Sequence, residues 1–176
     1  MIHIIDNAAP VSILDFIRSI AEKRETWHYK CPTASYVRFK DKHPKLDLIV
    51  NGNIVDNFLA GLAIGALMAT FDRGGNEYFL PEVLYSGISI KDSTREDNTH
   101  VDHDDRNDIV KVLYLLNTDW QEEWKGGFKY DGEVYNFKPG SAIIFDPRVP
   151  HSADEILGDE KRLALDFAVR VANNEF

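Results

Sequence analysis

The chain has 176 residues, 44% of them hydrophobic, and it is long enough to bury one core, so we expect a single domain over residues 1–176. Its net charge of -9 argues against sequence-independent binding to nucleic acid, which depends on Lys and Arg that neutralise phosphates. No apolar run is long enough to cross a bilayer, no signal peptide is recognisable, and the single cysteine, Cys31, excludes an intrachain disulfide. We therefore expect a cytoplasmic globular protein without a membrane or nucleic-acid partner, whose oligomeric state is open.

The N-terminal half is expected to form a helical support over about residues 1–77. Residues 11–22 carry apolar side chains at helical spacing and predict a surface helix with one buried stripe. A second helix is expected from Asn53, a favourable N-cap residue, to about residue 71. Two short strands, over residues 33–40 and 46–50, are expected between these helices.

The C-terminal half is expected to consist of short strands. Runs rich in branched and aromatic residues alternate with turn-forming pairs such as Asp131-Gly132. The expected strands cover residues 83–90, 99–103, 109–116, 127–130, 133–137, 141–145, 151–154 and 162–171. This series favours a double-stranded β-helix, or jelly roll, over an open parallel sheet. The expected fold is therefore mostly β with N-terminal helices (α+β), with a jelly-roll core over about residues 78–172 packed against those helices.

His100, Asp102 and His151 form a pattern typical of a metal site. Side chains two positions apart on a strand leave from the same face, so His100 and Asp102 can reach one ion. His151, on a later strand, would supply the third ligand. Two imidazoles and one carboxylate on one face of an octahedral ion form the arrangement of non-haem Fe(II) oxygenases, which leaves positions open for O2 and a cosubstrate.

A second His-x-Asp pair, His103 and Asp105, overlaps the first. The two pairs cannot both hold the ion. We favour His100 and Asp102 because Val101 between them is apolar, as expected of a strand residue that turns into the core.

Ordered motifs between about residues 83 and 171 resemble those of the 2-oxoglutarate- and Fe(II)-dependent prolyl hydroxylases. The motifs are THVDHDD, IVKVLYLLNTDW, a Gly-Gly pair, KPGSAIIFDPRVPH and KRLALDFAV, in the order that this family uses. The resemblance implies that His100, Asp102 and His151 hold Fe(II) and that 2-oxoglutarate binds beside the metal. It also implies O2 as co-reactant and ascorbate as a further cofactor.

In such a pocket the distal carboxylate of 2-oxoglutarate needs a buried cation. Arg162 is the expected cation, because its guanidinium can hold a carboxylate through two parallel hydrogen bonds, and Lys161 is the alternative. Tyr85, on the strand before the iron motif, either offers its hydroxyl to the cosubstrate or packs as a core aromatic residue. The family often has a tyrosine where this chain has Leu115, so Tyr85, Tyr114 or a water would replace that hydrogen bond.

The resemblance implies a dioxygenase that hydroxylates an aliphatic carbon and releases succinate and CO2. The expected substrate is a prolyl residue in a peptide or protein partner. One alternative is the same chemistry on a free amino acid, another type of residue or a small metabolite. A further alternative is a jelly-roll module that binds metal without turnover. Residues 91–98 form a charged segment that we expect to close over the substrate.

Overall fold

A computed structural model describes residues 1–28, 44–73, 82–94, 99–102 and 105–171 of the chain. In chain order its elements are β1 (Ile2–Ile5), α1 (Val11–Ala21), β2 (Lys45–Val50), β3 (Asn53–Ile54), α2 (Asn57–Arg73), β4 (Glu82–Lys91), β5 (Ile109–Leu115), a 3-10 helix (Glu122–Trp124), β6 (Phe128–Tyr130), β7 (Glu133–Tyr135), β8 (Ala142–Phe145), β9 (His151–Ala153) and β10 (Arg162–Arg170).

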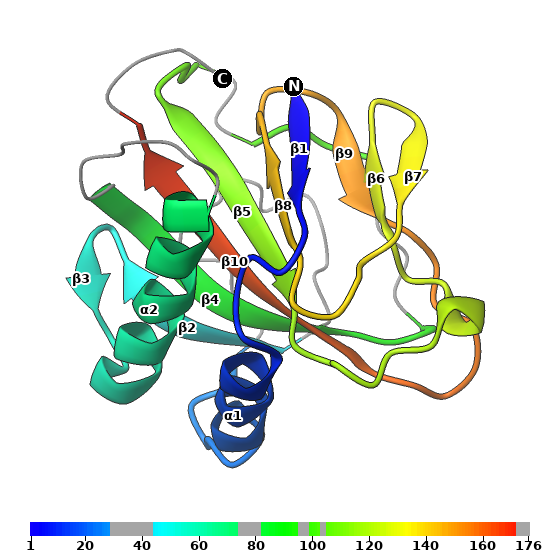
Figure 1. Cartoon of the computed structure of the whole chain (residues 1–176), viewed down its shortest axis with the longest axis horizontal. Helices are drawn as coiled ribbons and strands as arrows, with labels where there is room; N and C mark the ends of the chain where they lie inside the picture. Colours follow the sequence, from blue (N-terminus) through cyan, green and yellow to red (C-terminus); the bar gives the residue numbers. More distant parts are fainter. Residues whose placement is uncertain (29–43, 74–81, 95–98, 103–104, 172–176) are drawn as a thin grey trace.

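The strands form two antiparallel sheets. The larger sheet has seven strands in the order β1-β8-β5-β10-β4-β2-β3, and the smaller has three in the order β7-β6-β9. Helices α1 and α2 cover one face of the larger sheet, and β6, β7 and β9 lie on its other side (Figure 1). The expected fold, mostly β with N-terminal helices packed against a jelly-roll core, is confirmed.

Alternating residues of β10, in the middle of the larger sheet, face two different environments. Leu163, Leu165 and Phe167 lie in the core between the sheet and the helices, together with Leu59 and Leu67 of α2. Because successive strand residues point to opposite faces, the residues between them point toward the three-stranded sheet. We call this second face of the larger sheet the inner face; it is where the functional candidates are found.

The helices confirm the expected elements, with one corrected boundary. The expected helix over residues 11–22 corresponds to α1, whereas α2 begins at Asn57 rather than at Asn53. The carboxylate of Asp56 accepts hydrogen bonds from the backbone N–H groups of Phe58 and Leu59, at 3.1 and 3.0 Å, and so caps the helix. Asn53 instead pairs with Val50 in the β2–β3 hairpin.

Three strand expectations need comment. Strand β1, at the start of the chain, was not expected; it pairs with β8 and forms one edge of the larger sheet. The strand expected over residues 99–103 is reduced, within the described residues, to a single bridge between His100 and His151. The strand expected over 33–40 falls outside the described residues. In the described part of the chain, no helix combines the length and apolar character that crossing a membrane needs.

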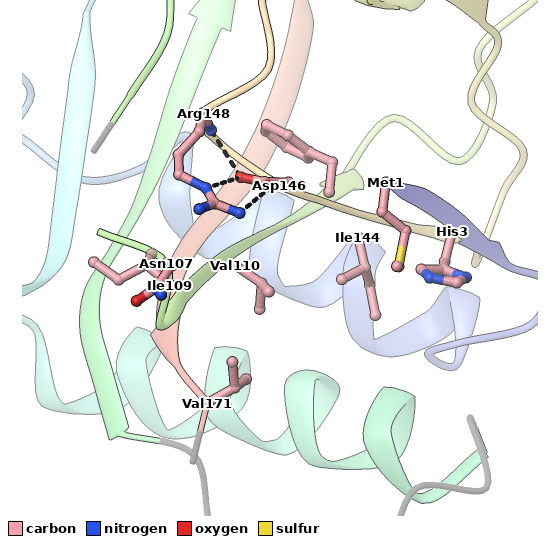
Figure 2. A pocket seen from close by; sticks show the side chains of 10 residues that line it. Met1, His3, Asn107, Ile109, Val110, Ile144, Asp146, Arg148 and Val171 are labelled. Carbon is pink, nitrogen blue, oxygen red and sulfur yellow. Dashed lines mark hydrogen bonds and ion pairs between the residues drawn. The ribbon is translucent and has the colours of Figure 1, made fainter. Parts of the chain in front are cut away.

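A cavity of about 240 Å³ lies beside β1, β8 and β5, at the end of the larger sheet. Figure 2 shows apolar side chains of Val110, Ile144 and Val171 on one side of it and the ion pair of Arg148 with Asp146 on another. Its lining includes neither the expected metal ligands nor Arg162. The candidate site therefore lies elsewhere.

Candidate metal centre and cosubstrate pocket

The structure brings His100, Asp102 and His151 together. One possible ligand atom from each residue lies within 4.8 Å of the others. The carboxylate oxygens of Asp102 are 3.9 Å from Nε2 of His100 and 3.7 Å from Nε2 of His151. An ion with bonds of about 2 Å to nitrogen and oxygen fits among these atoms. Two imidazoles and a carboxylate also match the donor set expected for Fe(II).

Backbone hydrogen bonds fix the positions of these three residues. His100 and His151 face each other in an antiparallel bridge in which each N–H donates to the other carbonyl at 2.9 Å. The backbone N–H of Asp102 donates to the carbonyl of Pro147 at 2.8 Å. Backbone hydrogen bonds at both His100 and Asp102 therefore connect this segment to residues at and just before the start of β9.

The imidazole of His151 is oriented for metal binding. Its Nδ1 lies 2.8 Å from the carbonyl oxygen of Val149. A carbonyl only accepts hydrogen bonds, so Nδ1 carries the proton and Nε2 keeps its lone pair for a metal. The ring is 5% exposed and packs against Phe128 and Phe145, with ring centroids 5.8 and 4.9 Å away. This packing holds the ring in place before any ion binds.

Lys111, in the middle of β5, adds a buried cation that sequence analysis missed. Its Nζ lies 2.6 Å from Asp166 Oδ2 and 3.6 Å from Asp102 Oδ2. Burial alone would raise the pKa of Asp102, but the positive charge of Lys111 acts in the opposite direction, and the pKa lies well below its ordinary value. Asp102 is therefore ionised, as a metal ligand must be. The signal in the sequence was a single lysine inside the apolar run IVKVLYL.

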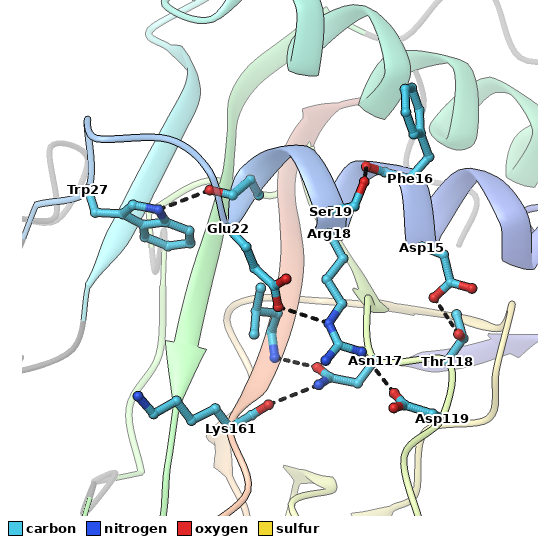
Figure 3. A network of polar contacts seen from close by, with 12 residues as sticks. Asp15, Phe16, Arg18, Ser19, Glu22, Trp27, Asn117, Thr118, Asp119 and Lys161 are labelled. Atoms are coloured by element: carbon cyan, nitrogen blue, oxygen red, sulfur yellow. Dashed lines mark hydrogen bonds and ion pairs between the residues drawn. The ribbon is translucent and has the colours of Figure 1, made fainter.

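Arg162 and Lys161 point to opposite sides of the larger sheet. Arg162 is 7% exposed and lies on the inner face, where its guanidinium donates to the carbonyls of Gly126 and Gly127, the latter at 3.0 Å. Lys161 is exposed, on the helix side of the sheet, and its carbonyl accepts a hydrogen bond from Asn117 at 2.9 Å (Figure 3). The geometry favours Arg162 over Lys161 as the buried cation of the inner face.

The structure does not bring Tyr114 to the site. Its hydroxyl lies 2.6 Å from Oγ1 of Thr70 on α2, and its ring packs against Phe167 in the core between sheet and helices. Burial raises the pKa of this phenol. The expectation that Tyr114 binds the cosubstrate is wrong because its side chain leaves β5 on the face opposite to Lys111.

Tyr85 lies on the inner face but far from Arg162. It is paired with Ala168, which is about 20 Å from Arg162 along β10 at about 3.3 Å per residue. Its ring lies across Gly87, where a Cβ atom would come within 2.2 Å of the hydroxyl, and that hydroxyl donates to Asp47 at 3.4 Å. The backbone of Tyr85 is therefore remote from that of Arg162, and a contact between Tyr85 and the cosubstrate stays a prediction.

Three further expectations concern Leu115, the overlapping His-x-Asp motif and the proposed lid. Leu115 is on the inner face, paired with Ala164, and offers no hydrogen-bond donor from its side chain. Asp105 is exposed and is not a member of the metal-binding cluster found among the described residues. Its partner in the overlapping motif, His103, lies outside the described residues, as does the part of the proposed lid after residue 94.

Comparison with known proteins finds matches among solved structures and not among protein families or curated proteins. A prolyl-4-hydroxylase from Pseudomonas putida is 14% identical, with a TM-score of 0.65 and coverage of 98% of this chain and 93% of the other. A Trichoplax adhaerens prolyl hydroxylase, in complex with a hypoxia inducible factor peptide fragment, is 15% identical, with a TM-score of 0.64 and coverage of 97% and 83%. HygX from Streptomyces hygroscopicus, with nickel, 2-oxoglutarate and hygromycin B bound, is 12% identical, with a TM-score of 0.66 and the same coverage.

These similarities extend over nearly the whole chain. They establish that it has the fold of the 2-oxoglutarate- and Fe(II)-dependent oxygenases, prolyl hydroxylases among them. The resemblance of the sequence motifs is therefore confirmed at the level of the fold. Because fold alone does not fix chemistry, function has to be argued from the site.

Proposed function

We propose that this chain is an Fe(II)- and 2-oxoglutarate-dependent dioxygenase. The observation that carries the proposal is the convergence of two imidazoles and one ionised carboxylate, those of His100, His151 and Asp102, at a half-buried cluster beside β9. The buried guanidinium of Arg162, on the inner face of the larger sheet, would supply a counter-charge for a dicarboxylate cosubstrate. A site that binds metal for structure alone has no need of such a cation.

Each of these residues has a defined task. His100, Asp102 and His151 would hold the iron, and Arg162 would bind the distal carboxylate of 2-oxoglutarate. When bound, the iron supplies the oxidising chemistry in which O2, 2-oxoglutarate and a C–H group give succinate, CO2 and an alcohol. The rings of Phe128 and Phe145 around His151 exclude water from one side of the site.

The proposed reaction is hydroxylation of an aliphatic carbon on a prolyl residue of a peptide or protein. The motifs that resemble prolyl hydroxylases support this choice, as does the shared fold with prolyl hydroxylases, one of which is in complex with a peptide. The cytoplasm as location and ascorbate as a further cofactor belong to the same proposal.

A small molecule or free amino acid is a second candidate substrate. Beyond the metal, the inner face carries a polar group formed by Tyr85, Asp47 and His28, in which Asp47 lies 2.6 Å from Nε2 of His28. Such donors and acceptors suit a substrate rich in hydroxyl or amino groups better than an apolar prolyl ring. HygX, with hygromycin B bound, shows that the shared fold accommodates such a molecule.

The test is to incubate the protein with Fe(II), 2-oxoglutarate and O2, together with proline-containing peptides, free amino acids or neither. Succinate and products heavier by one oxygen atom are measured. With the wild-type protein and with Asp105→Ala, we expect one succinate for each hydroxylated peptide. With Asp102→Ala, we expect neither product. Product from free amino acids alone would support the second candidate. Bound metal with no succinate under any condition would contradict a dioxygenase and indicate a metal-binding module.

A further inference from the structure

Lys91, the last residue of β4, is paired with Arg162, the first residue of β10. Side chains directly opposite each other in an antiparallel pair leave from the same face, about 5 Å apart. The next pair, Ile90 and Leu163, packs on the helix side of the sheet. Lys91 and Arg162 therefore both point to the inner face.

Both cations are buried against the three-stranded sheet. Lys91 is 2% and Arg162 7% exposed. Nζ of Lys91 is 3.5 Å from the carbonyl oxygen of Ala153, and Arg162 donates to the carbonyl of Gly127 at 3.0 Å. These carbonyls are neighbours, because Ala153 of β9 is paired with Phe128, the residue after Gly127. The ammonium and the guanidinium thus converge on the adjoining ends of β6 and β9.

This location is two residues along β9 from the metal ligand His151. His151 precedes Ala153 on β9 by about 7 Å, at about 3.3 Å per residue. An extended 2-oxoglutarate molecule spans a similar distance between its keto acid and its distal carboxylate. On this face Leu115 offers no hydrogen-bond donor from its side chain. Tyr114 points to the helix side, and Tyr85 is paired with Ala168, six residues from Arg162 along β10.

We propose that Lys91 is a second cation for the distal carboxylate of 2-oxoglutarate and acts beside Arg162. This inference rests on the proposed function and names a further binding residue of the same pocket. The guanidinium gives directional, paired hydrogen bonds, and the ammonium adds a compact charge from the neighbouring strand. Two buried cations bind a cosubstrate that has a distal carboxylate more tightly than a 2-oxo acid whose distal end is uncharged. Lys91 should therefore contribute to the selectivity for 2-oxoglutarate over such 2-oxo monocarboxylates.

The test measures ligand binding without turnover. The protein is loaded with Ni(II), and 2-oxoglutarate or 2-oxopentanoate, in which a methyl group replaces the distal carboxylate, is titrated by calorimetry. We expect Lys91→Met to weaken binding of 2-oxoglutarate by about 10- to 100-fold, the loss typical of one charge-assisted hydrogen bond. Its affinity for 2-oxopentanoate should not change, and Lys91→Arg should retain most of the affinity for 2-oxoglutarate. The matched control is Lys161→Met, at an exposed lysine on the helix side, which should bind both ligands like the wild type.

The outcomes separate this inference from the proposed function. If Arg162→Met loses 2-oxoglutarate while Lys91→Met binds it like the wild type, Lys91 takes no part and the dioxygenase proposal stands. If the Ni(II)-loaded wild type does not bind 2-oxoglutarate, both fail. Should Lys91→Met not fold, Lys91→Gln takes its place in the same comparison of the two ligands.

Discussion

The two faces of β10 differ in chemistry although they belong to one strand. On the helix side, Leu163, Leu165 and Phe167 are at most 3% exposed in an apolar core. On the inner face, Arg162 and Asp166 make charged contacts with the opposite sheet and with a neighbouring strand. The comparison agrees with the proposed function, in which the helix side stabilises the fold and the inner face would bind the cosubstrate. Variants of each face should therefore change different measurements.

The largest effect is expected on the helix side. Phe167→Ala removes a fully buried ring that packs against Tyr114. We expect the free energy of unfolding, measured with urea, to fall by about 3–5 kcal/mol because a cavity remains. The affinity of the folded variant for Ni(II) should not change. A large loss of metal affinity would contradict the division between the two faces.

The next effect is expected at the metal ligands. Asp102→Ala removes the only carboxylate of the three-residue cluster found among the described residues. Affinity for Ni(II), measured anaerobically by calorimetry, should fall by more than about 100-fold, beyond the range typical of residues that only support a ligand. Asp105→Ala, at an exposed carboxylate of the overlapping motif, is the matched control and should bind like the wild type. The reverse result would assign the site to the second motif.

A smaller effect is expected for the buried lysine of the inner face. Lys111→Met leaves the carboxylates of Asp102 and Asp166 without the ammonium that contacts both. We expect the metal-free protein to lose about 1–3 kcal/mol of stability. Saturating Ni(II) should reduce the difference from the wild type, because the ion supplies positive charge beside Asp102. An equal loss with and without Ni(II) would show that Lys111 acts independently of the metal centre.

The smallest effect is expected at Tyr114. Tyr114→Phe removes a hydroxyl that lies 2.6 Å from Oγ1 of Thr70 on the helix side. The free energy of unfolding should fall by about 1 kcal/mol, with the affinity for 2-oxoglutarate unchanged. A weakened affinity for 2-oxoglutarate would indicate that Tyr114 contacts the cosubstrate, which would contradict its position in the core.

Sequence patterns predicted the orientation of side chains correctly where apolar and polar residues alternate along the chain. In β10, apolar residues alternate with Arg162 and Asp166, so the face of the strand that carries these two charged side chains could be predicted. His100 and Asp102 could be predicted as a pair because their spacing alone places them on one side of an extended chain. The three favoured ligands lie close together in the structure, and Arg162 is buried on the inner face, as its place in the alternation of β10 indicates.

The patterns failed where both faces of a strand are buried. In β5, the run from Ile109 to Leu115 is apolar on both sides, so the face that Tyr114 occupies depends on pairing with β8 and β10. Lys91 was expected in a charged loop, because its place on β4 depends on pairing with Arg162. The start of α2 was misplaced because Asn53 and Asp56 are both good helix caps. The positions of Tyr114 and Lys91 depend on pairing with strands that are distant in the sequence. The start of α2 depends on which of two equally favourable N-cap residues is used.

Anomalous diffraction at the iron edge, from crystals grown anaerobically with Fe(II), tests the central claim most directly. We expect one strong peak at about 2.0–2.2 Å from Nε2 of His100, Nε2 of His151 and a carboxylate oxygen of Asp102. Iron held by other residues, or no peak among these three, would contradict that claim.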